Sequence, residues 1–181
     1  MARALGFCLF DTAIGACGIA WTRDALAAVH LPEAEEDGTR RRLLRATGEV
    51  PEAPPPQFVQ AAIARIQALL QGAHDDLCDL PLDLEGVPAF HRKVYEITRA
   101  IPPGEVLTYG EVARRVGEPG ASRAVGQALG RNPFAPVVPC HRVLAAGGRS
   151  GGFSAEGGAQ TKLRMLEIEK ARFDGEPGLF G

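Results

Sequence analysis

The chain has 181 residues, of which 45% are hydrophobic and 23% are charged, and its formal net charge is -2. These values are typical of a globular protein with a buried core, and the length fits one large domain or two small ones but excludes a long multidomain chain. Asp11, Arg23 and Asp24 interrupt the most apolar stretch, near the N-terminus. We therefore expect neither a membrane span nor a signal peptide, and a cytoplasmic protein.

The two halves of the chain differ in charge. Before Pro88 there are 7 Lys and Arg residues against 13 Asp and Glu, and from Pro88 onward there are 13 against 9. A basic half can attract a polyanion such as DNA, although unevenly distributed surface charge would give the same count.

The cysteines are few and irregularly spaced, which argues against a disulfide scaffold and for reduced thiols. A zinc site that combined two of them with His30 and His91 would lack the short ligand spacing that usually starts such a site, so we predict no metal. The cysteines are Cys8, Cys17, Cys78 and Cys140.

The first half predicts a small antiparallel sheet from extended segments at residues 5–10, 16–21 and 27–31, with a turn at residues 11–15. Residues 32–56 are acidic, then Arg-rich, then Pro-rich, and predict surface loop with a possible helix over 39–47.

An amphipathic helix follows Pro56 and should cover the sheet. Its apolar stripe consists of Val59, Ile63, Ile66 and Leu70, and it should end near Gly72. Residues 79–87 then predict a connector or an edge strand.

From Pro88 a helix is predicted that carries Phe90, Val94, Ile97 and Ile101 on one face and stops before Pro102. We therefore place a domain boundary between residues 1–87 and 88–181.

Two short helices with helix-turn-helix spacing come next, over residues 109–116 and 121–129. The second carries small residues and is nearly bare apart from Arg123 and Gln127. Such a surface allows either tight packing inside a core or close approach to DNA, and the basic surroundings favour DNA. The small residues are Ala121, Ser122, Ala124, Gly126 and Ala128.

A reactive thiol is indicated at Cys140, which is followed by His141 after an apolar segment with three prolines. Cysteine attacks as the thiolate, and an imidazole can take its proton. Neighbouring strand residues point to opposite faces, so contact between the two side chains needs a turn or a bridging water. A buried structural cysteine beside a surface histidine is the alternative.

A carboxylate partner for His141 is indicated near the C-terminus. In a helix predicted over residues 161–170, Glu169 falls on the same face as Met165 and Leu166. A buried carboxylate needs a hydrogen bond, and His141 is the candidate, unless Glu169 lies in water at the helix end. The carboxylate would hold the imidazole tautomer and favour its protonated form.

The sequence Pro-Cys-His-Arg-Val at 139–143, with Asn132-Pro133 before it, strongly resembles the O6-alkylguanine-DNA alkyltransferases. The resemblance covers about residues 88–170 and includes Arg123-Ala124-Val125-Gly126 and the segment from Lys162 to Glu169. It implies an α+β fold in which a small N-terminal antiparallel sheet with a helix, RNase H-like, precedes a mainly helical, winged-helix-like domain that contains the helix-turn-helix.

The resemblance also implies roles for individual residues. Cys140 would accept the alkyl group irreversibly from guanine O6, and less well from O4-methylthymine, with His141 acting through water and oriented by Glu169. Asn132 would brace the active-site turn, and Tyr109 and Lys162 would protonate or neutralise the departing guanine.

Recognition of the base would fall to the second short helix, placed in the minor groove of duplex DNA. Arg123 would fill the gap left by the flipped nucleotide. Contacts to DNA are expected from Ala121, Ser122, Arg123, Ala124, Gly126 and Gln127, and walls of the substrate pocket from Pro139, Val143, Phe153 and Ser154.

The sequence departs from the family pattern around Phe153 and Ser154, where many members have a tyrosine before a Gly-Gly pair. The pocket wall there is therefore expected to differ.

The resemblance implies a single-turnover enzyme that acts as a monomer without a cofactor. Two alternatives stay open. One is a related protein that binds alkylated bases without transfer, although such proteins lack the cysteine. The other is a Cys-His-Glu hydrolase, for which Arg123 and the helix-turn-helix would have no use.

Overall fold

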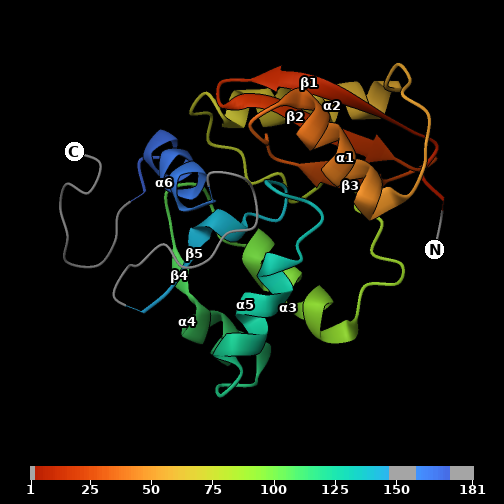
Figure 1. Cartoon of the computed structure of the whole chain (residues 1–181). Helices are drawn as coiled ribbons and strands as arrows, with labels where there is room; N and C mark the ends of the chain where they lie inside the picture. Colours follow the sequence, from red (N-terminus) through yellow and green to blue (C-terminus); the bar gives the residue numbers. More distant parts are fainter. Residues whose placement is uncertain (1–2, 147–157, 172–181) are drawn as a thin grey trace.

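The computed structural model describes residues 3–146 and 158–171. A sheet with two helices forms one half of the molecule, and a group of short helices forms the other (Figure 1). This is the α+β fold that the sequence predicts. Across the described ranges, no helix combines the length and apolarity that crossing a bilayer requires.

The sheet consists of β1 (Gly6–Thr12), β2 (Gly15–Trp21) and β3 (Leu26–His30), and its neighbouring strands are antiparallel. All three predicted strands are confirmed. The turn between β1 and β2 is shorter than predicted, because both strands continue until only Ala13 and Ile14 separate them. Gly15 closes this turn with a φ of 123°, a value that glycine adopts without strain.

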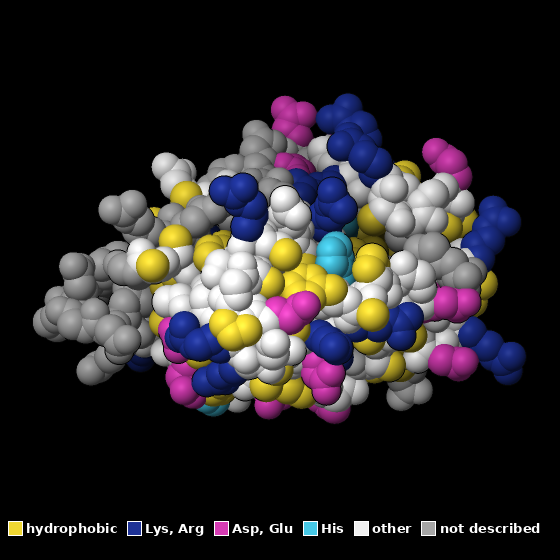
Figure 2. Space-filling view, turned by 90° about the horizontal axis from the view of Figure 1, so that it is seen from below, with side chains coloured by type: hydrophobic (Ala, Val, Ile, Leu, Met, Phe, Trp, Pro, Cys, Tyr) yellow, Lys and Arg dark blue, Asp and Glu magenta, His cyan; other side chains and the backbone are white. Residues whose placement is uncertain are grey.

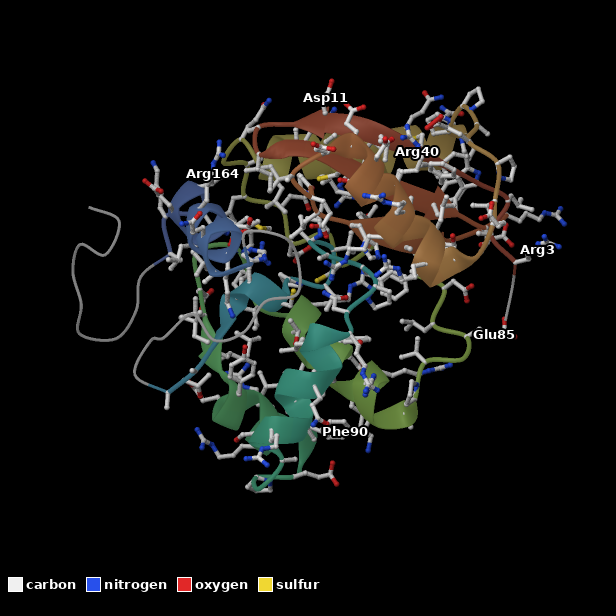
Figure 3. All side chains as sticks on the ribbon, in the orientation of Figure 1. Arg3, Asp11, Arg40, Glu85, Phe90 and Arg164 are labelled. Atoms are coloured by element: carbon white, nitrogen blue, oxygen red, sulfur yellow. The ribbon has the colours of Figure 1, made fainter. Side chains whose placement is uncertain are left out.

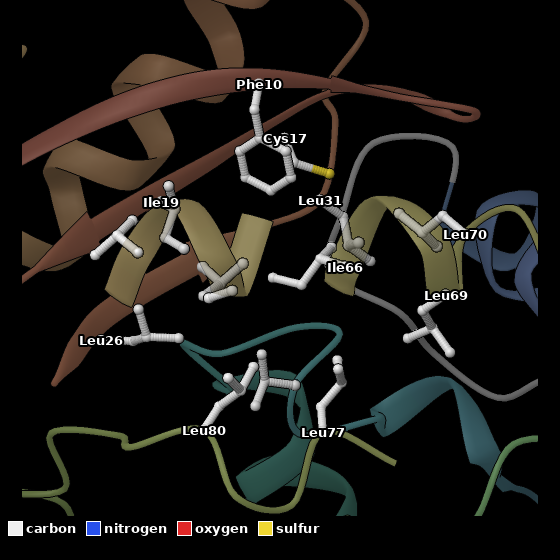
Figure 4. Close-up of a cluster of buried hydrophobic side chains, with 14 of the residues drawn as sticks. Phe10, Cys17, Ile19, Leu26, Leu31, Ile66, Leu69, Leu70, Leu77 and Leu80 are labelled. Atoms are coloured by element: carbon white, nitrogen blue, oxygen red, sulfur yellow. The ribbon is translucent and has the colours of Figure 1, made fainter. Parts of the chain in front are cut away.

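The two faces of the sheet are covered by different helices. On one face, the side chains of Ile19 and Leu26 belong to the same buried cluster as Ile66 of α2 (Gln57–Leu69), which Figure 4 shows. The predicted cover of the sheet by this helix is therefore confirmed. The alternation of side chains along a strand sends Ala20 to the opposite face, where it packs with Leu43 of α1 (Glu36–Thr47).

The α1 helix begins three residues earlier than predicted and lies close to the strands. A β-carbon on Gly18 would stand 3.2 Å from Cδ2 of Leu43, so the glycine permits the helix to approach the sheet. Residues 79–87 form a connector, in which Leu82 makes one isolated bridge to Leu26.

The second half begins with α3 (Ala89–Arg99), whose most buried side chains are Val94, Tyr95 and Thr98. The predicted stripe is confirmed as the side that faces the core, because Val94 and Ile101 are buried there and the half-buried Phe90 and Ile97 pack against the same cluster. The polar atoms of the buried pair are satisfied, because Tyr95 donates to the carbonyl of Ala128 at 2.7 Å and Thr98 donates to that of Val94 at 2.7 Å.

The helix-turn-helix is formed by α4 (Tyr109–Val116) and α5 (Ser122–Gly130). Thr108 and Glu111 make a reciprocal capping box at the start of α4, and Gly117 ends that helix with a φ of 93°. The short strands β4 (Leu107–Thr108) and β5 (Val143–Leu144) pair in parallel beside it.

The last described helix, α6 (Gly158–Ile168), ends two residues before the predicted terminus. It contacts the first half through Arg164, which points from α6 toward the β1–β2 turn (Figure 3) and donates to the carbonyl of Ala13 at 2.9 Å. At the sheet edge, the N–H of Val29 donates to the carbonyl of Pro133 at 2.8 Å. The loop that leads to Cys140 is thus fastened to β3.

Candidate active site

Cys140 lies in a single 3-10 turn, η1 (Cys140–Arg142). Consecutive side chains in such a turn diverge by about 120°. Cys140 packs into the core of the second half, while His141 and Arg142 both reach Glu169. The bend that the sequence required after the prolines is therefore present, and it serves to bring His141 to Glu169.

Glu169 forms a buried network with two neighbouring residues of η1. Its Oε2 lies 2.7 Å from Nε2 of His141, which is the predicted hydrogen bond. Nε and Nη2 of Arg142 donate to its two carboxylate oxygens, each at 2.9 Å. The side chains of all three residues are at most 3% exposed. Glu169 stands one residue beyond α6, not within it as predicted.

Arg142 is the residue of this buried network to which the sequence analysis gave no role. The arginine is part of the Pro-Cys-His-Arg sequence, but nothing in the sequence distinguishes a buried arginine from an exposed one. Its third contact, from Nη1 to the carbonyl of Ile101 at 2.7 Å, fastens the segment after α3 to the site.

The surroundings of His141 lower its pKa and so favour the neutral imidazole. Burial would raise the pKa of Glu169, but the adjoining His141 and Arg142 lower it to about 2. Burial lowers the pKa of His141, Glu169 opposes this effect, and the charges of Arg142 and Lys162 reinforce it. Glu169 thus acts in the expected direction, toward the protonated imidazole, but burial outweighs it and the pKa of His141 falls below its ordinary value.

The tautomer of His141 follows from its partner. An ionised Glu169 can only accept hydrogen bonds, so Nε2 of the neutral imidazole carries the proton. Nδ1 then has a free lone pair and can accept a proton. The geometry thus prepares His141 as a base.

Cys140 is held as a thiol in the resting site. Burial raises its pKa, while the Asn132 side chain, the charge of Lys162 and backbone N–H groups act in the opposite direction. Asn132 also braces the preceding loop, because its amide donates to the carbonyl of Val138 at 2.8 Å and accepts from the N–H of Phe134 at 2.9 Å.

A second polar pair, Tyr109 and Lys162, lies close to the thiol. Nζ of Lys162 is 3.5 Å from the Tyr109 hydroxyl and 5.7 Å from the centre of its ring. Lys162 is 1% exposed, and burial lowers its pKa to about 8 against the opposing effect of Cys140. Burial and Cys140 both raise the pKa of Tyr109. A lysine with this pKa can donate a proton near neutral pH.

A groove of about 880 Å³ runs between α4 and α5. Tyr109 of α4 and Gly126 of α5 lie opposite each other in this groove. A β-carbon added to Gly126 would lie 3.9 Å from the ring of Tyr109. The groove is lined, among the described residues, by Thr108, Tyr109, Gly110, Arg114, Ser122, Arg123, Gly126, Gln127, Gly130, Ala145 and Ala146.

The α5 helix presents two different faces. Val125, Ala128 and Leu129 are buried in the core, whereas Arg123 and Gln127 are exposed. Of the small residues, Ala128 packs in the core, while Ser122 and Gly126 line the groove. Figure 2 views this end of the molecule and shows Lys and Arg side chains interspersed with Asp and Glu.

Several predicted residues lie away from the groove. Ala121 and Ala124 are half-buried and do not line it, and Pro139 and Val143 are buried. Phe153 and Ser154 lie outside the described residues. Within 3–146 and 158–171, no three His, Cys, Asp or Glu side chains gather in a way that could hold a metal ion.

Comparison with known proteins agrees with this geometry. The family model described as 6-O-methylguanine DNA methyltransferase, DNA binding domain, matches residues 89–171. A methylated-DNA--protein-cysteine methyltransferase of Mycobacterium tuberculosis is 39% identical over 145 residues, which are 78% of this chain and 86% of the relative. A methylated-DNA--protein-cysteine methyltransferase of Methanothermobacter thermautotrophicus is 33% identical over 159 residues, which are 88% of this chain and 82% of the relative.

Solved structures give the same result. The crystal structure of Mycobacterium tuberculosis OGT in complex with DNA has a TM-score of 0.73 at 33% identity and covers 92% of this chain and 93% of its own. The O6-methylguanine-DNA methyltransferase of Pyrococcus kodakaraensis strain KOD1 has a TM-score of 0.70 at 29% identity, with coverage of 91% and 98%. The chain belongs to the methylated-DNA--protein-cysteine methyltransferase family.

Proposed function

We propose that this protein repairs duplex DNA by transferring the alkyl group of O6-alkylguanine, and less readily that of O4-methylthymine, to its own Cys140. The observation that carries the proposal is the buried Cys140 beside the His141–Glu169 pair in a chain of this family. The protein is consumed in one turnover, because the thioether that forms is not cleaved.

The chemistry follows from the residues around the thiol. His141 takes the thiol proton through a water, and the sulfur attacks the alkyl carbon. The new S–C bond forms as the C–O bond to guanine breaks, and the electron pair goes to the base. Lys162, through Tyr109, supplies a proton to the departing guanine. The net change moves the alkyl group to sulfur and one hydrogen to the base.

DNA binding is assigned to the groove and the exposed face of α5. Cys140 is buried, with 6% of the residue exposed, so its thiol cannot reach a base inside a duplex and the nucleotide must be flipped out. The small side chains on α5 permit close approach in the minor groove, and Arg123 is exposed and free to enter the base stack. Arg114 and Gln127 also line the groove and would contact the strand.

We further propose that residues 88–181 carry binding and transfer while 1–87 form a structural domain. The match of the family model to residues 89–171 supports this division. Monomeric action without a cofactor is proposed because one thiol and one lesion complete the reaction. A reducing, cytoplasmic compartment would keep that thiol reduced.

Transfer of label tests the function. Duplex DNA with one O6-methylguanine, radiolabelled in the methyl group, should pass its label to the wild-type protein and not to Cys140→Ala, which should still bind the duplex. Cys78→Ala, which removes an exposed thiol, is the matched control and should accept label normally. Equal labelling of Cys140→Ala contradicts the assignment. Tight lesion binding without transfer by the wild type favours a recognition protein.

A further inference from the structure

Arg142 is more than a structural neighbour of the acceptor cysteine. We propose that it is a positioning residue: by sharing the Glu169 carboxylate with His141, it holds the imidazole in the orientation that takes the thiol proton, and its charge adds to the effect of burial in keeping the imidazole neutral. This inference rests on the proposed function, because it concerns the same reaction.

The hydrogen-bond geometry leaves the carboxylate no freedom to rotate. The guanidinium donates from Nε to Oε1 and from Nη2 to Oε2, the planar two-point contact that arginine forms with carboxylates. Oε2 is also the atom that faces Nε2 of His141. The plane of the arginine therefore sets the position of the oxygen that holds the imidazole.

The guanidinium of Arg142 is itself held in place by a backbone carbonyl on the side away from Glu169. Nη1 donates to the carbonyl of Ile101 at 2.7 Å, and Arg142 is 1% exposed. A lysine at this position could offer only one ammonium in place of the three directed nitrogens. The contact thus depends on arginine and not only on a positive charge.

The charges around His141 explain why the sharing matters. A lone buried carboxylate favours imidazolium, which has no free lone pair and cannot accept the thiol proton. Here, one negative charge, on Glu169, faces two positive ones, Arg142 in η1 and Lys162 in α6. Three further titratable groups lie near this cluster. Cys140 is the other such group in η1, Tyr109 of α4 lies near Cys140, and Cys78 lies near Arg142.

The full-length Arg142→Met and Arg142→Lys variants test the proposal, with Arg45→Met as a control at an exposed position of α1. NMR titration of the His141 ring is the first measurement. We expect the pKa of His141 to rise in Arg142→Met, because Glu169 then acts on the imidazole undiminished, and to stay near the wild-type value in Arg142→Lys.

The pH profile of Cys140 alkylation by free O6-benzylguanine is the second measurement. In Arg142→Met the acidic limb should move to higher pH, and the rate at pH 7 should fall at least about tenfold. Arg142→Lys, which keeps the charge but loses the two-point contact, should be slowed at every pH without a shift of the limb. It also serves as the test if Arg142→Met does not fold.

Three results would count against these ideas in distinguishable ways. An unmoved His141 titration in folded Arg142→Met, or a wild-type rate in Arg142→Lys, overturns the role of Arg142. A wild-type protein that never alkylates Cys140 contradicts the proposed function instead, whatever the titration shows.

Discussion

The ammonium of Lys162 lies 3.5 Å from the hydroxyl of Tyr109, although 53 residues separate the two in the chain. The lysine is 1% exposed, and among the described residues no carboxylate forms an ion pair with it. Burying a charge in this way destabilises the fold. A buried lysine that lowers the stability of the fold would be retained if the reaction needs its proton near the guanine base.

Lys162→Met should stabilise the protein and slow transfer. The pKa of Lys162 falls from 10.5 to about 8 on folding, so the destabilisation is fully present below pH 8 and disappears as the pH rises toward 10.5. We expect the variant to gain on the order of 2 kcal/mol in the free energy of unfolding at pH 7 and little at pH 10.5.

Urea unfolding at both pH values measures this difference, and Lys93→Met, at an exposed position of α3, is the control. A variant less stable than the wild type at pH 7 would show that the lysine is stabilised by its surroundings.

Glu169→Gln should be less stable and less reactive, because it leaves the buried Arg142 without its carboxylate. The folded pKa of Glu169 is about 2 against an ordinary 4.5. Its contribution is therefore present above pH 4.5 and is lost as the pH falls toward 2. We expect a loss on the order of 3 kcal/mol at pH 7, which shrinks across that acidic window.

Chemical unfolding at pH 7 and at pH 3 measures the free energy of unfolding of the wild type and of Glu169→Gln. Glu167→Gln, at an exposed position of α6, is the control. If the stability of the wild type and of Glu169→Gln changed with pH in the same way, the charge of Glu169 would not stabilise the fold through His141 and Arg142. A wild-type rate of Cys140 alkylation would remove its part in the reaction.

Arg123→Ala should slow repair of duplex DNA much more than reaction with the free base O6-benzylguanine, since only a duplex has a gap to fill. We expect a loss of at least about tenfold on duplex and less than about twofold on the free base. Single-turnover rates on both substrates check this, with Arg45→Ala as the control. Equal losses on the two substrates would exclude a role in base flipping.

Much of this arrangement could be predicted from local patterns. The spacing of Met165, Leu166 and Glu169 placed a carboxylate on a buried face, and the hydrogen bond to His141 is present. The small residues of α5 predicted a bare surface, which the groove confirms on one side of the helix.

Other features depended on contacts that no local pattern contains. The burial of Tyr95 and Thr98 beside the apolar stripe of α3 was missed, because it depends on backbone carbonyls that accept hydrogen bonds from their hydroxyl groups. The cover of the second sheet face by α1 was missed because Leu43 is the only large apolar side chain fully buried from that helix. The lowered pKa of His141 depends first on its own burial and then on the charges of Arg142 and Lys162, and only the tertiary structure reveals these surroundings.

The central claim is that Cys140 accepts the alkyl group. Its most direct test is the intact mass of the protein after incubation with duplex DNA that carries one O6-methylguanine, followed by peptide mapping. The account predicts that the protein gains one methyl group in place of one hydrogen, located on Cys140, with one adduct per chain. An unchanged mass after complete binding of the lesion, or a methyl group on another cysteine, would contradict it.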